Sequence, residues 1–198
     1  MKTFFTSDLH FGHEKVIKFD NRPFHSVEEM DEELIRRWNN KVKKGDLVYV
    51  LGDFIWRSRE EKVADFIKRL NGQIILIKGN HDHFLHNADA KKALSGLKDY
   101  DDISVKLEDG STRRCILSHY FIPFYNGHLH KAIHLHGHSH NTDEHFMELG
   151  IEQAINSAGK TVEIYNVGCM HWNYEPVTLD EILRSKEETI TDVKADEI

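Results

Sequence analysis

The chain carries many imidazole groups, and several of them stand beside carboxylates in short polar clusters. Fifteen of its 198 residues are histidine. No lysine or arginine lies inside any of the clusters. Carboxylates and imidazoles gathered in one pocket repel each other or lose hydration unless cations bind them, so we expect a metal site. The clusters are Asp8-Leu9-His10, Gly52-Asp53, Gly79-Asn80-His81-Asp82, Ser118-His119 and Gly137-His138-Ser139-His140.

Two divalent ions are expected from the number of candidate ligands, if one carboxylate bridges them and water completes each shell. A nitrogen and oxygen set without sulfur suits Mn²⁺, Fe, Zn²⁺ or Ni²⁺ better than Ca²⁺ or Mg²⁺, and we expect Mn²⁺. Two ions about 3.5–4 Å apart would lower the pKa of a water between them toward roughly 7 and supply hydroxide for attack on phosphorus. The candidate ligands are Asp8, His10, Asp53, Asn80, His119, His138 and His140.

Each cluster follows a short apolar run that is typical of a strand buried on both faces. In open α/β sheets ligands bind at the carboxyl ends of the strands. The clusters should therefore converge if the strands are parallel neighbours or belong to two facing sheets. The runs are Thr3–Thr6, Leu47–Leu51, Gln73–Lys78, Arg114–Leu117 and Ala132–Leu135.

Helix signals between the first three strands predict parallel crossovers. Ser26-Val27-Glu28-Glu29 and Ser58-Arg59-Glu60-Glu61 are capping boxes, each followed by an apolar stripe at helical spacing. Strands that alternate with helices in this way favour an α/β fold with right-handed connections. The turn signal Glu108-Asp109-Gly110-Ser111 joins Ile103–Leu107 and Arg113–Leu117 into a predicted antiparallel hairpin.

The later part of the chain gives weaker signals. Thr161–Val167 is interpreted as a late strand, and Thr178-Leu179-Asp180-Glu181 as the start of a short helix. Over residues 142–160 apolar spacing allows an amphipathic helix, but Gly150 interrupts it, so this segment stays open. We expect one domain over residues 1–184 and a polar tail over residues 185–198.

The five clusters, in this order and each after a predicted strand, resemble the motifs of the calcineurin-like metallophosphoesterase superfamily. The resemblance implies a four-layer sandwich of two facing mixed β-sheets flanked by helices. It implies that Asp53 bridges two metal ions. It further implies that Asp8, His10 and His140 complete one site, and that Asn80, His119 and His138 complete the other.

The same resemblance gives His81 a role other than metal binding. His81 would donate a proton to the leaving oxygen or hydrogen-bond the phosphoryl group, and Asp82 would orient it. The opening His10-Phe11-Gly12-His13 and the later Asn21-Arg22-Pro23-Phe24 also resemble a small bacterial and phage subgroup of predicted phosphoesterases.

Four further residues are candidates for substrate binding. His13 could bind phosphate or support a metal ligand, or simply face solvent at the start of a helix. Arg22 could clamp a phosphate with its planar guanidinium or pair with a surface carboxylate. Phe124 and Tyr125 belong to an aromatic segment after His119, which could form a wall for a base or pack as an ordinary loop.

Composition excludes several function classes. The formal charge is −7, which disfavours an extended nucleic-acid surface but not a compact phosphate pocket. No apolar run approaches the roughly 20 residues that cross a bilayer, and no signal-peptide stretch is present, so we expect no membrane partner. Two lone cysteines fit a reducing cytoplasm.

Together these features predict a dinuclear-metal phosphoesterase that uses a hydroxide between the ions to hydrolyse a small phosphorylated molecule. A nucleotide-like phosphodiester is favoured, because nothing in the sequence suggests a cap over the site. Two alternatives remain: a DNA or RNA nuclease of the same superfamily, and a metal-binding scaffold without catalysis that exposes a sizeable apolar patch. Oligomeric state is not readable from the sequence.

Overall fold

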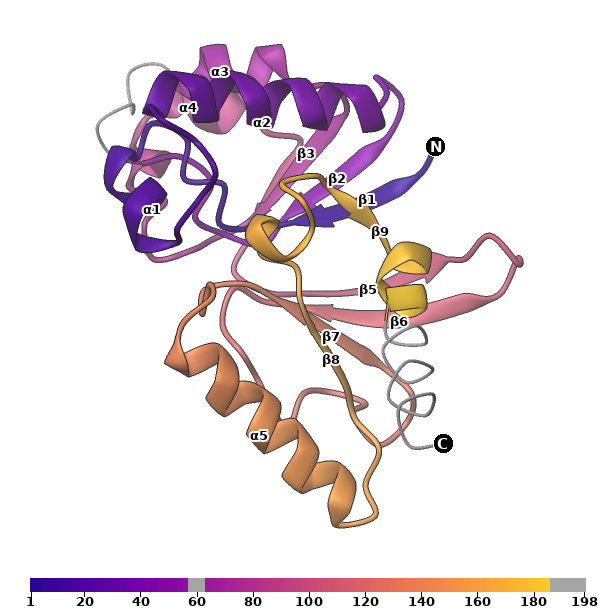
Figure 1. The fold of residues 1–198 in the computed structure, drawn as a ribbon. Helices are drawn as coiled ribbons and strands as arrows, with labels where there is room; N and C mark the ends of the chain where they lie inside the picture. Colours follow the sequence, from indigo (N-terminus) through magenta and orange to yellow (C-terminus); the bar gives the residue numbers. More distant parts are fainter. Residues whose placement is uncertain (57–62, 186–198) are drawn as a thin grey trace.

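Two sheets, of five and four strands, form the centre of the computed structural model, which describes residues 1–56 and 63–185. Helices cover the first sheet on one side of the molecule, and a single long helix lies outside the second sheet on the other (Figure 1). The chain therefore has the predicted α/β architecture of two facing mixed sheets flanked by helices.

The first sheet has the order β4-β3-β2-β1-β9. Strands β1 to β4 run parallel to one another, and β9 pairs antiparallel with β1. The predicted strands β1, β2 and β3 are confirmed, whereas β4 and β9 are too short and too mixed in composition to give a sequence signal. The bounds are β1 (Thr3–Thr6), β2 (Leu47–Val50), β3 (Gln73–Ile77), β4 (Gly96–Lys98) and β9 (Val177–Thr178).

The second sheet has the order β5-β6-β7-β8. The expected hairpin is β5 with β6, which pair antiparallel, while β6, β7 and β8 are parallel. The late strand is β8. The bounds are β5 (Asp101–Lys106), β6 (Thr112–Leu117), β7 (Ile133–His136) and β8 (Glu163–Asn166).

Helices α2, α3 and α4 lie together over the first sheet (Figure 1). Helix α2 begins as its capping box predicts, because the Ser26 hydroxyl accepts a hydrogen bond from the Glu29 amide at 3.2 Å. The second predicted capping box, at Ser58, lies outside the described residues. The bounds are α1 (Glu14–Phe19), α2 (Val27–Lys41), α3 (Val63–Arg69), α4 (Ala88–Ala93) and the 3₁₀ turns η2 (His83–His86) and η3 (Cys169–His171).

Helix α5 (Asp143–Ser157) settles the segment that the sequence left open. The helix runs through Gly150 without a break and contains no buried residue. A helix that packs few side chains into a core tolerates a glycine because the lost packing is small. Of the predicted tail over residues 185–198, only Ser185 is described. Among the described residues no helix has the length and apolarity needed to cross a membrane.

Of the three buried cores among the described residues, two lie on the faces of the first sheet and explain why its strand signals are continuous apolar runs. One core lies between the sheets. It contains Phe5, Leu51 and Ile77 from the first sheet and its loops, and Leu117 and Leu135 from the second sheet. On the opposite face of the first sheet, helix residues such as Trp38 pack on the strands in a separate core. Successive side chains of a strand alternate between these faces, so both must be apolar. The polar clusters begin where the strands end.

Candidate metal centre

The predicted clusters meet at the carboxyl ends of the strands of both sheets. Backbone hydrogen bonds join one cluster to the next: the Asp8 amide donates to Gly52, the His10 amide to Asp53, and the Gly137 amide to His119, each at 3.0 Å. Loops at the ends of neighbouring strands are thus held in register. The first and the last cluster are joined in addition by the His138 amide, which donates to Oδ1 and Oδ2 of Asp8 at 3.2 and 3.1 Å.

The backbone at this place is left-handed to an unusual degree. The φ angles of Asp8, His10, Asp53, His138 and His140 lie between 49° and 73°. This conformation costs roughly 1–2 kcal/mol per non-glycine residue. Such strain persists only where surrounding structure imposes it, and it turns the five side chains toward one another.

Glycines allow the clusters to approach closely. A Cβ atom added to Gly137 would lie 2.3 Å from Ser7 Oγ and 2.5 Å from Asp8 Oδ2, and one added to Gly79 would lie 2.3 Å from Asp53 Oδ1. Any larger residue at these positions would displace a candidate ligand. The glycines in the two motifs are therefore needed for the shape of the site.

A first group of side chains comprises Asp8, His10, Asp53 and His140, whose potential ligand atoms all lie within 4.8 Å of one another. Nε2 of His10 lies 3.1 Å from Nε2 of His140 and 3.6 Å from Oδ2 of Asp53. Nε2 of His140 lies 3.5 Å from Oδ1 of Asp8. All four residues are buried.

A second group comprises Asp53, His119 and His138. Nε2 of His119 lies 3.7 Å from Oδ2 of Asp53 and 2.9 Å from Oδ1 of Asn80, which adds an amide oxygen to the group. Oδ2 of Asp53 therefore faces both groups. The structure brings all seven candidate ligands together in the two sets that the resemblance implies.

The tautomers of two histidines show that this donor set fits cations. Nδ1 of His140 lies 2.7 Å from an Asp20 oxygen, and Nδ1 of His119 lies 2.8 Å from the Leu51 carbonyl oxygen. Each Nδ1 must carry the proton to make its bond, so in the neutral ring each Nε2 presents a lone pair to the centre. Lone pairs and carboxylate oxygens that face one another need cations between them. Two divalent ions of the expected kind fit these donors.

The pKa shifts of three ligands follow from burial among like groups, whereas the pKa of His140 is raised, because the lowering by burial is outweighed by the hydrogen bond to Asp20 and the Asp8 charge. Burial lowers the pKa of His10, and the neighbouring His140 lowers it further. Burial also lowers the pKa of His138, while it raises the pKa of Asp53, with the Asp8 charge acting in the same direction. Neutral imidazoles are the form in which histidine binds metal.

Asp20 supports the first group and was missed by the sequence analysis. Its side chain is 1% exposed and accepts hydrogen bonds from His140 and from Arg22. Although burial alone would raise it, these bonds hold the pKa of Asp20 below its ordinary value. A carboxylate behind a ligating histidine fixes the tautomer and orientation of its ring. An isolated Asp before a loop carries no sequence signal for this role.

The expectation that Arg22 clamps a substrate phosphate is wrong. The guanidinium is 0% exposed and donates to Asp20, to the Asp8 carbonyl at 2.8 Å and to the Leu9 carbonyl at 3.0 Å. The planar guanidinium thus directs its N–H donors to the backbone of Asp8, a candidate ligand, and of its neighbour Leu9. Arg22 therefore shapes the centre from behind and does not reach substrate.

The expectation that Asp82 orients His81 is also wrong. Both carboxylate oxygens of the buried Asp82 accept backbone hydrogen bonds, from Asp53 at 3.1 Å, Phe54 at 2.9 Å and Gly79 at 2.7 Å. Asp82 thereby ties the loop after β2 to the loop after β3. Burial raises the pKa of this carboxyl to about 6.

His81 and His13 lie on the same side of the first group. The His81 amide donates to Oδ1 of Asp53 at 2.9 Å, and the His81 ring lies 5.6 Å from that of His10. The His13 ring lies 5.4 Å from His10 and stacks on Trp56 at 3.7 Å. Burial lowers the pKa of His13 to about 4. A stacked neutral ring beside a ligand fits the supporting role better than a solvent-facing one.

Of the two interpretations of the segment with Phe124 and Tyr125, the structure supports the packed loop for Tyr125. The Tyr125 ring is buried, and its hydroxyl lies 2.9 Å from the Ala132 carbonyl and 3.1 Å from that of Glu163. Phe124 is exposed and packs against His128. The aromatic side chain at the centre is Tyr120, whose ring lies 5.0 Å from His119 and 4.6 Å from His138. It follows a ligand directly in sequence, which was the available signal.

A cavity of about 450 Å³ opens over the two groups. Asp53, His81, His138 and His140 line it, together with the exposed ring of Phe19 and polar residues at the start of α5. Ligand pockets in proteins span roughly 300–1,000 Å³. Three candidate ligands, Asp53, His138 and His140, thus share one solvent-accessible space with His81.

The chain is similar to one described protein family and to proteins of an archaeon and a phage. The family model described as calcineurin-like phosphoesterase matches residues 1–157. The uncharacterized protein MJ1445 of Methanocaldococcus jannaschii is 35% identical over 184 residues, covering 92% of this chain and 90% of the relative. The Gene 66 protein of Mycobacterium phage L5 is 30% identical over 196 residues, covering 83% and 93%.

One solved structure has the same fold. The protein of unknown function AQ665 from Aquifex aeolicus aligns with a TM-score of 0.65 at 23% identity, covering 92% of this chain and 97% of that one. The likeness concerns the arrangement of sheets and helices, and it extends over almost the whole of both chains.

Proposed function

Because the chain belongs to the calcineurin-like phosphoesterase family, we propose that it is a two-metal phosphoesterase that hydrolyses a small phosphorylated molecule. Family membership and the buried Asp and His cluster indicate a metal-dependent phosphoesterase. The observation that carries the proposal is the position of Asp53, whose Oδ2 faces His10 at 3.6 Å and His119 at 3.7 Å. One carboxylate shared by two donor groups supports a dinuclear site.

Asp8, His10, Asp53 and His140 would hold one ion, and Asp53, Asn80, His119 and His138 the other. When bound, such ions supply a hydroxide nucleophile at neutral pH and stabilise charge on the phosphoryl oxygens. We favour Mn²⁺ for this mixed nitrogen and oxygen set.

His81 is the proposed proton donor to the leaving oxygen. Its ring lines the cavity over the centre but belongs to neither ligand group. The backbone amide of His81 donates a hydrogen bond to Asp53, which holds the residue next to the proposed bridging carboxylate. General-acid help of this kind contributes typically 10²–10⁴-fold to a rate, most for a poor leaving group such as an alkoxide.

A diester substrate is favoured over a monoester. The cavity is open, and among the described residues that line it there is no arginine or lysine that would neutralise a terminal phosphate dianion. A diester carries one negative charge less than a monoester dianion, so it fits such a lining better.

The two free, buried cysteines suit a reducing compartment, and we propose the cytoplasm as the place of action.

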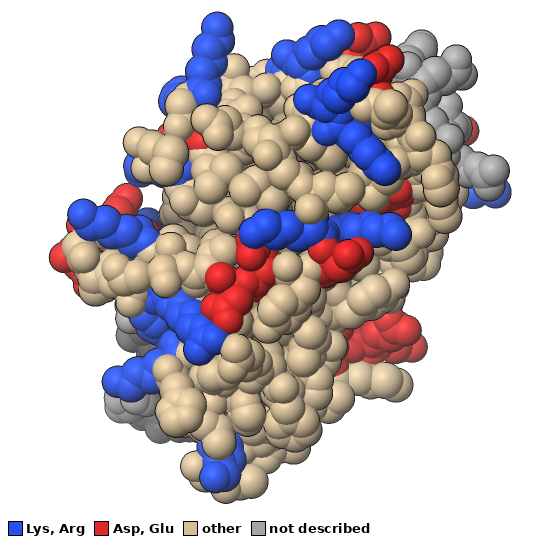
Figure 2. Space-filling model, turned by 180° about the vertical axis from the view of Figure 1, so that it is seen from behind, with Lys and Arg blue, Asp and Glu red and all other residues tan. Residues whose placement is uncertain are grey.

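A nuclease is less well supported. On the face in Figure 2, Lys and Arg side chains are scattered and interleaved with Asp and Glu, and they form no continuous stripe. The net charge of −7 adds to this argument. Proteins that bind long nucleic acids neutralise many phosphates with clustered cations.

The second candidate function is a metal-loaded interaction scaffold, and helix α5 is the observation in its favour. Phe146, Met147, Leu149 and Ile151 of this helix are each at least 42% exposed. Exposed apolar patches mark interaction surfaces in many proteins. The scaffold predicts no hydrolysis of any phosphoester.

Removal and return of metal tests the proposal. The protein is stripped with a chelator, dialysed, and assayed on bis-p-nitrophenyl phosphate and p-nitrophenyl phosphate before and after Mn²⁺ is added. We expect no turnover without metal, recovery with Mn²⁺, and a higher kcat/KM on the diester. Asp53→Asn serves as the blank, because it removes the shared carboxylate. Turnover that survives complete chelation would contradict the proposal, and absence of turnover with every metal tried would favour the scaffold.

A further inference from the structure

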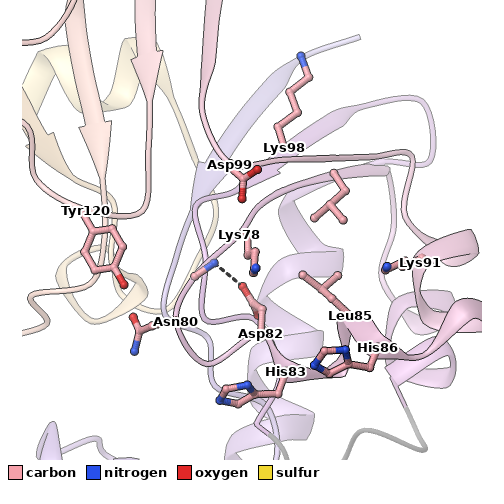
Figure 3. A pocket seen from close by; sticks show the side chains of 12 residues that line it. Lys78, Asn80, Asp82, His83, Leu85, His86, Lys91, Lys98, Asp99 and Tyr120 are labelled. Carbon is pink, nitrogen blue, oxygen red and sulfur yellow. Dashed lines mark hydrogen bonds between the residues drawn. The ribbon is translucent and has the colours of Figure 1, made fainter.

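A second cavity, of about 690 Å³, lies beside the metal centre (Figure 3). It shares Asn80, the amide ligand candidate, with the centre, and Tyr120 stands beside Asn80 on the same side (Figure 3). The opposite side is formed by η2 and α4. We call it the lysine cavity, and its lining is Lys78, Gly79, Asn80, Asp82, His83, Leu85, His86, Lys91, Leu97, Lys98, Asp99 and Tyr120.

The lysine cavity differs in charge from the rest of this acidic chain. Three lysines line it, and among the described residues Lys78 and Lys91 form no ion pair, whereas Lys98 pairs with Asp101 at 2.7 Å. Of the two aspartates, Asp82 has its carboxylate occupied by three backbone amides. Asp99 is the remaining acidic group.

The arrangement of these groups suits a phosphate. In Figure 3, Lys78 lies between Asn80 on one side and Lys91 on the other, and the rings of His83 and His86 border the same space. Ammonium and imidazole N–H groups that converge on an open cavity are donors for phosphate oxygens. In the part of the chain that the structure describes, no lysine or arginine lines the cavity over the ligands.

Tyr120 adds an apolar surface between the centre and the lysine cavity. Its ring is 50% exposed and lies against His119 and His138. An exposed ring in this position can stack on a planar base or pack on a sugar. The cavity volume is within the range of pockets that hold ligands of nucleotide size.

We propose that the substrate carries two phosphate groups, one at the metal centre and a second in the lysine cavity, with a nucleoside body against Tyr120. The inference rests on the proposed function and narrows its substrate class to nucleoside phosphodiesters that carry a second phosphate outside the reacting bond. Adenosine 3′,5′-bisphosphate has such a second phosphate without a diester that could be hydrolysed. Lys78 and Lys91 bind the second phosphate. The net charge of −7 and the scattered cations on the face in Figure 2 favour a small molecule over a long nucleic acid.

Equilibrium binding tests the proposal directly. The Mn²⁺-reconstituted protein is titrated with adenosine 3′,5′-bisphosphate and with adenosine 5′-monophosphate by calorimetry, and each ligand is checked by chromatography afterwards. We expect the bisphosphate to bind at least roughly tenfold more tightly, because a charged hydrogen-bonded contact is worth about that factor. The preference should shrink as salt is raised. Equal affinity for the two ligands would overturn the proposal.

Neighbouring lysines of α4 provide a matched control. Lys91 lines the cavity, whereas Lys92 is absent from its lining and pairs with Asp89 on the surface. Lys78→Gln and Lys91→Gln should each reduce the preference for the bisphosphate by severalfold, and Lys92→Gln should leave it unchanged. An equal loss in Lys91→Gln and Lys92→Gln would overturn the assignment, because it would indicate a general effect of charge.

Two further measurements separate this inference from its premise. Hydrolysis of bis-p-nitrophenyl phosphate by the wild-type protein requires no second phosphate, so its absence would contradict the proposed function while the binding preference could stand. A single-stranded oligonucleotide that binds more than tenfold tighter than the bisphosphate would overturn the restriction to small molecules.

Discussion

The carboxylate of Asp20 lies 2.7 Å from Nδ1 of His140 and is itself held by Arg22 at 2.8 Å. Arg22 in turn donates to the carbonyl of Asp8. Two ligand candidates of the first group, far apart in sequence, are therefore positioned by one buried ion pair. Both side chains of this pair are buried, with 0% exposure for Arg22 and 1% for Asp20, so the pair acts through the ligands.

Asp20→Asn should weaken metal binding without removing a ligand. The amide cannot enforce the Nδ1–H tautomer of His140 as the carboxylate does, so we expect a loss of metal affinity of about 10–100-fold. Titration of the stripped protein with Mn²⁺ measures it. Asp102→Asn, which breaks an ion pair with Arg114 on β6, is the matched control and should bind metal normally. Unchanged affinity in Asp20→Asn would contradict the supporting role.

His81→Gln should separate chemistry from metal binding. Glutamine keeps the backbone amide that donates to Asp53 but cannot act as a general acid, so kcat should fall by about 10²–10⁴-fold on a diester with a poor leaving group. The metal content after dialysis should equal that of the wild type, whereas Asp53→Asn should lose metal. Equal metal loss in both variants would mean that His81 is a ligand.

Gly137→Ala should disrupt the centre through a single methyl group. The new Cβ would lie 2.3 Å from Ser7 Oγ and 2.5 Å from Asp8 Oδ2, so Asp8 must shift and metal affinity should drop by at least roughly tenfold. Gly150→Ala on α5 is the control, because its Cβ meets nothing within 4 Å. That change should raise the free energy of unfolding by roughly 0.5–1 kcal/mol. Thermal unfolding and metal titration of both variants decide the matter, and normal metal affinity in Gly137→Ala would contradict the prediction.

His134 should make the protein sensitive to acid. The buried ring has Nδ1 at 3.0 Å from the Ile116 carbonyl and accepts from the Ile122 amide at Nε2, so only the neutral form satisfies both bonds. Burial lowers its pKa to about 4 from 6.5. The folded state thus binds fewer protons than the unfolded state between these values. The stability that His134 contributes is complete above pH 6.5 and is lost as pH falls toward 4.

His134→Gln is the test, because an amide can make both bonds but does not titrate in this range. Between pH 7 and pH 4 the wild type should lose up to about 3 kcal/mol more of its unfolding free energy than the variant. Urea unfolding at a series of pH values measures the difference. Parallel pH profiles for the two proteins would show that the ring does not resist protonation.

The sequence was sufficient for the strands that precede the polar clusters and for the residues that gather at the ends of these strands. Strands β1, β2 and β3 are buried on both faces, which makes their apolar runs continuous and their ends abrupt. Asp53 and His138 could be placed at one site because parallel strands end at the same edge. Strands β4 and β9 are short edge elements with no such contrast in polarity.

The roles of Asp82 and Arg22 depend on contacts with residues that are distant in sequence, so they could not be inferred in the same way. Asp82 stands next to His81 in sequence, yet its oxygens accept amides from two loops. Arg22 is buried because Asp20 and two carbonyls surround it, a fact that no local pattern encodes. The aromatic rings that lie against the candidate ligands are those of Tyr120 and Trp56, whereas the sequence drew attention to Phe124 and Tyr125.

The candidate ligands come from two sheets with a shared apolar core between them: Asp8, His10, Asp53 and Asn80 follow strands of the first, and His119, His138 and His140 follow strands of the second. Bound ions would link the loops of the first sheet to the loops of the second sheet at one end of that core. Since a ligand that binds only the folded state stabilises it in proportion to the logarithm of its concentration, resistance to heat would rise with the supply of free metal. A cell short of the ion would then lose the protein itself as well as its activity.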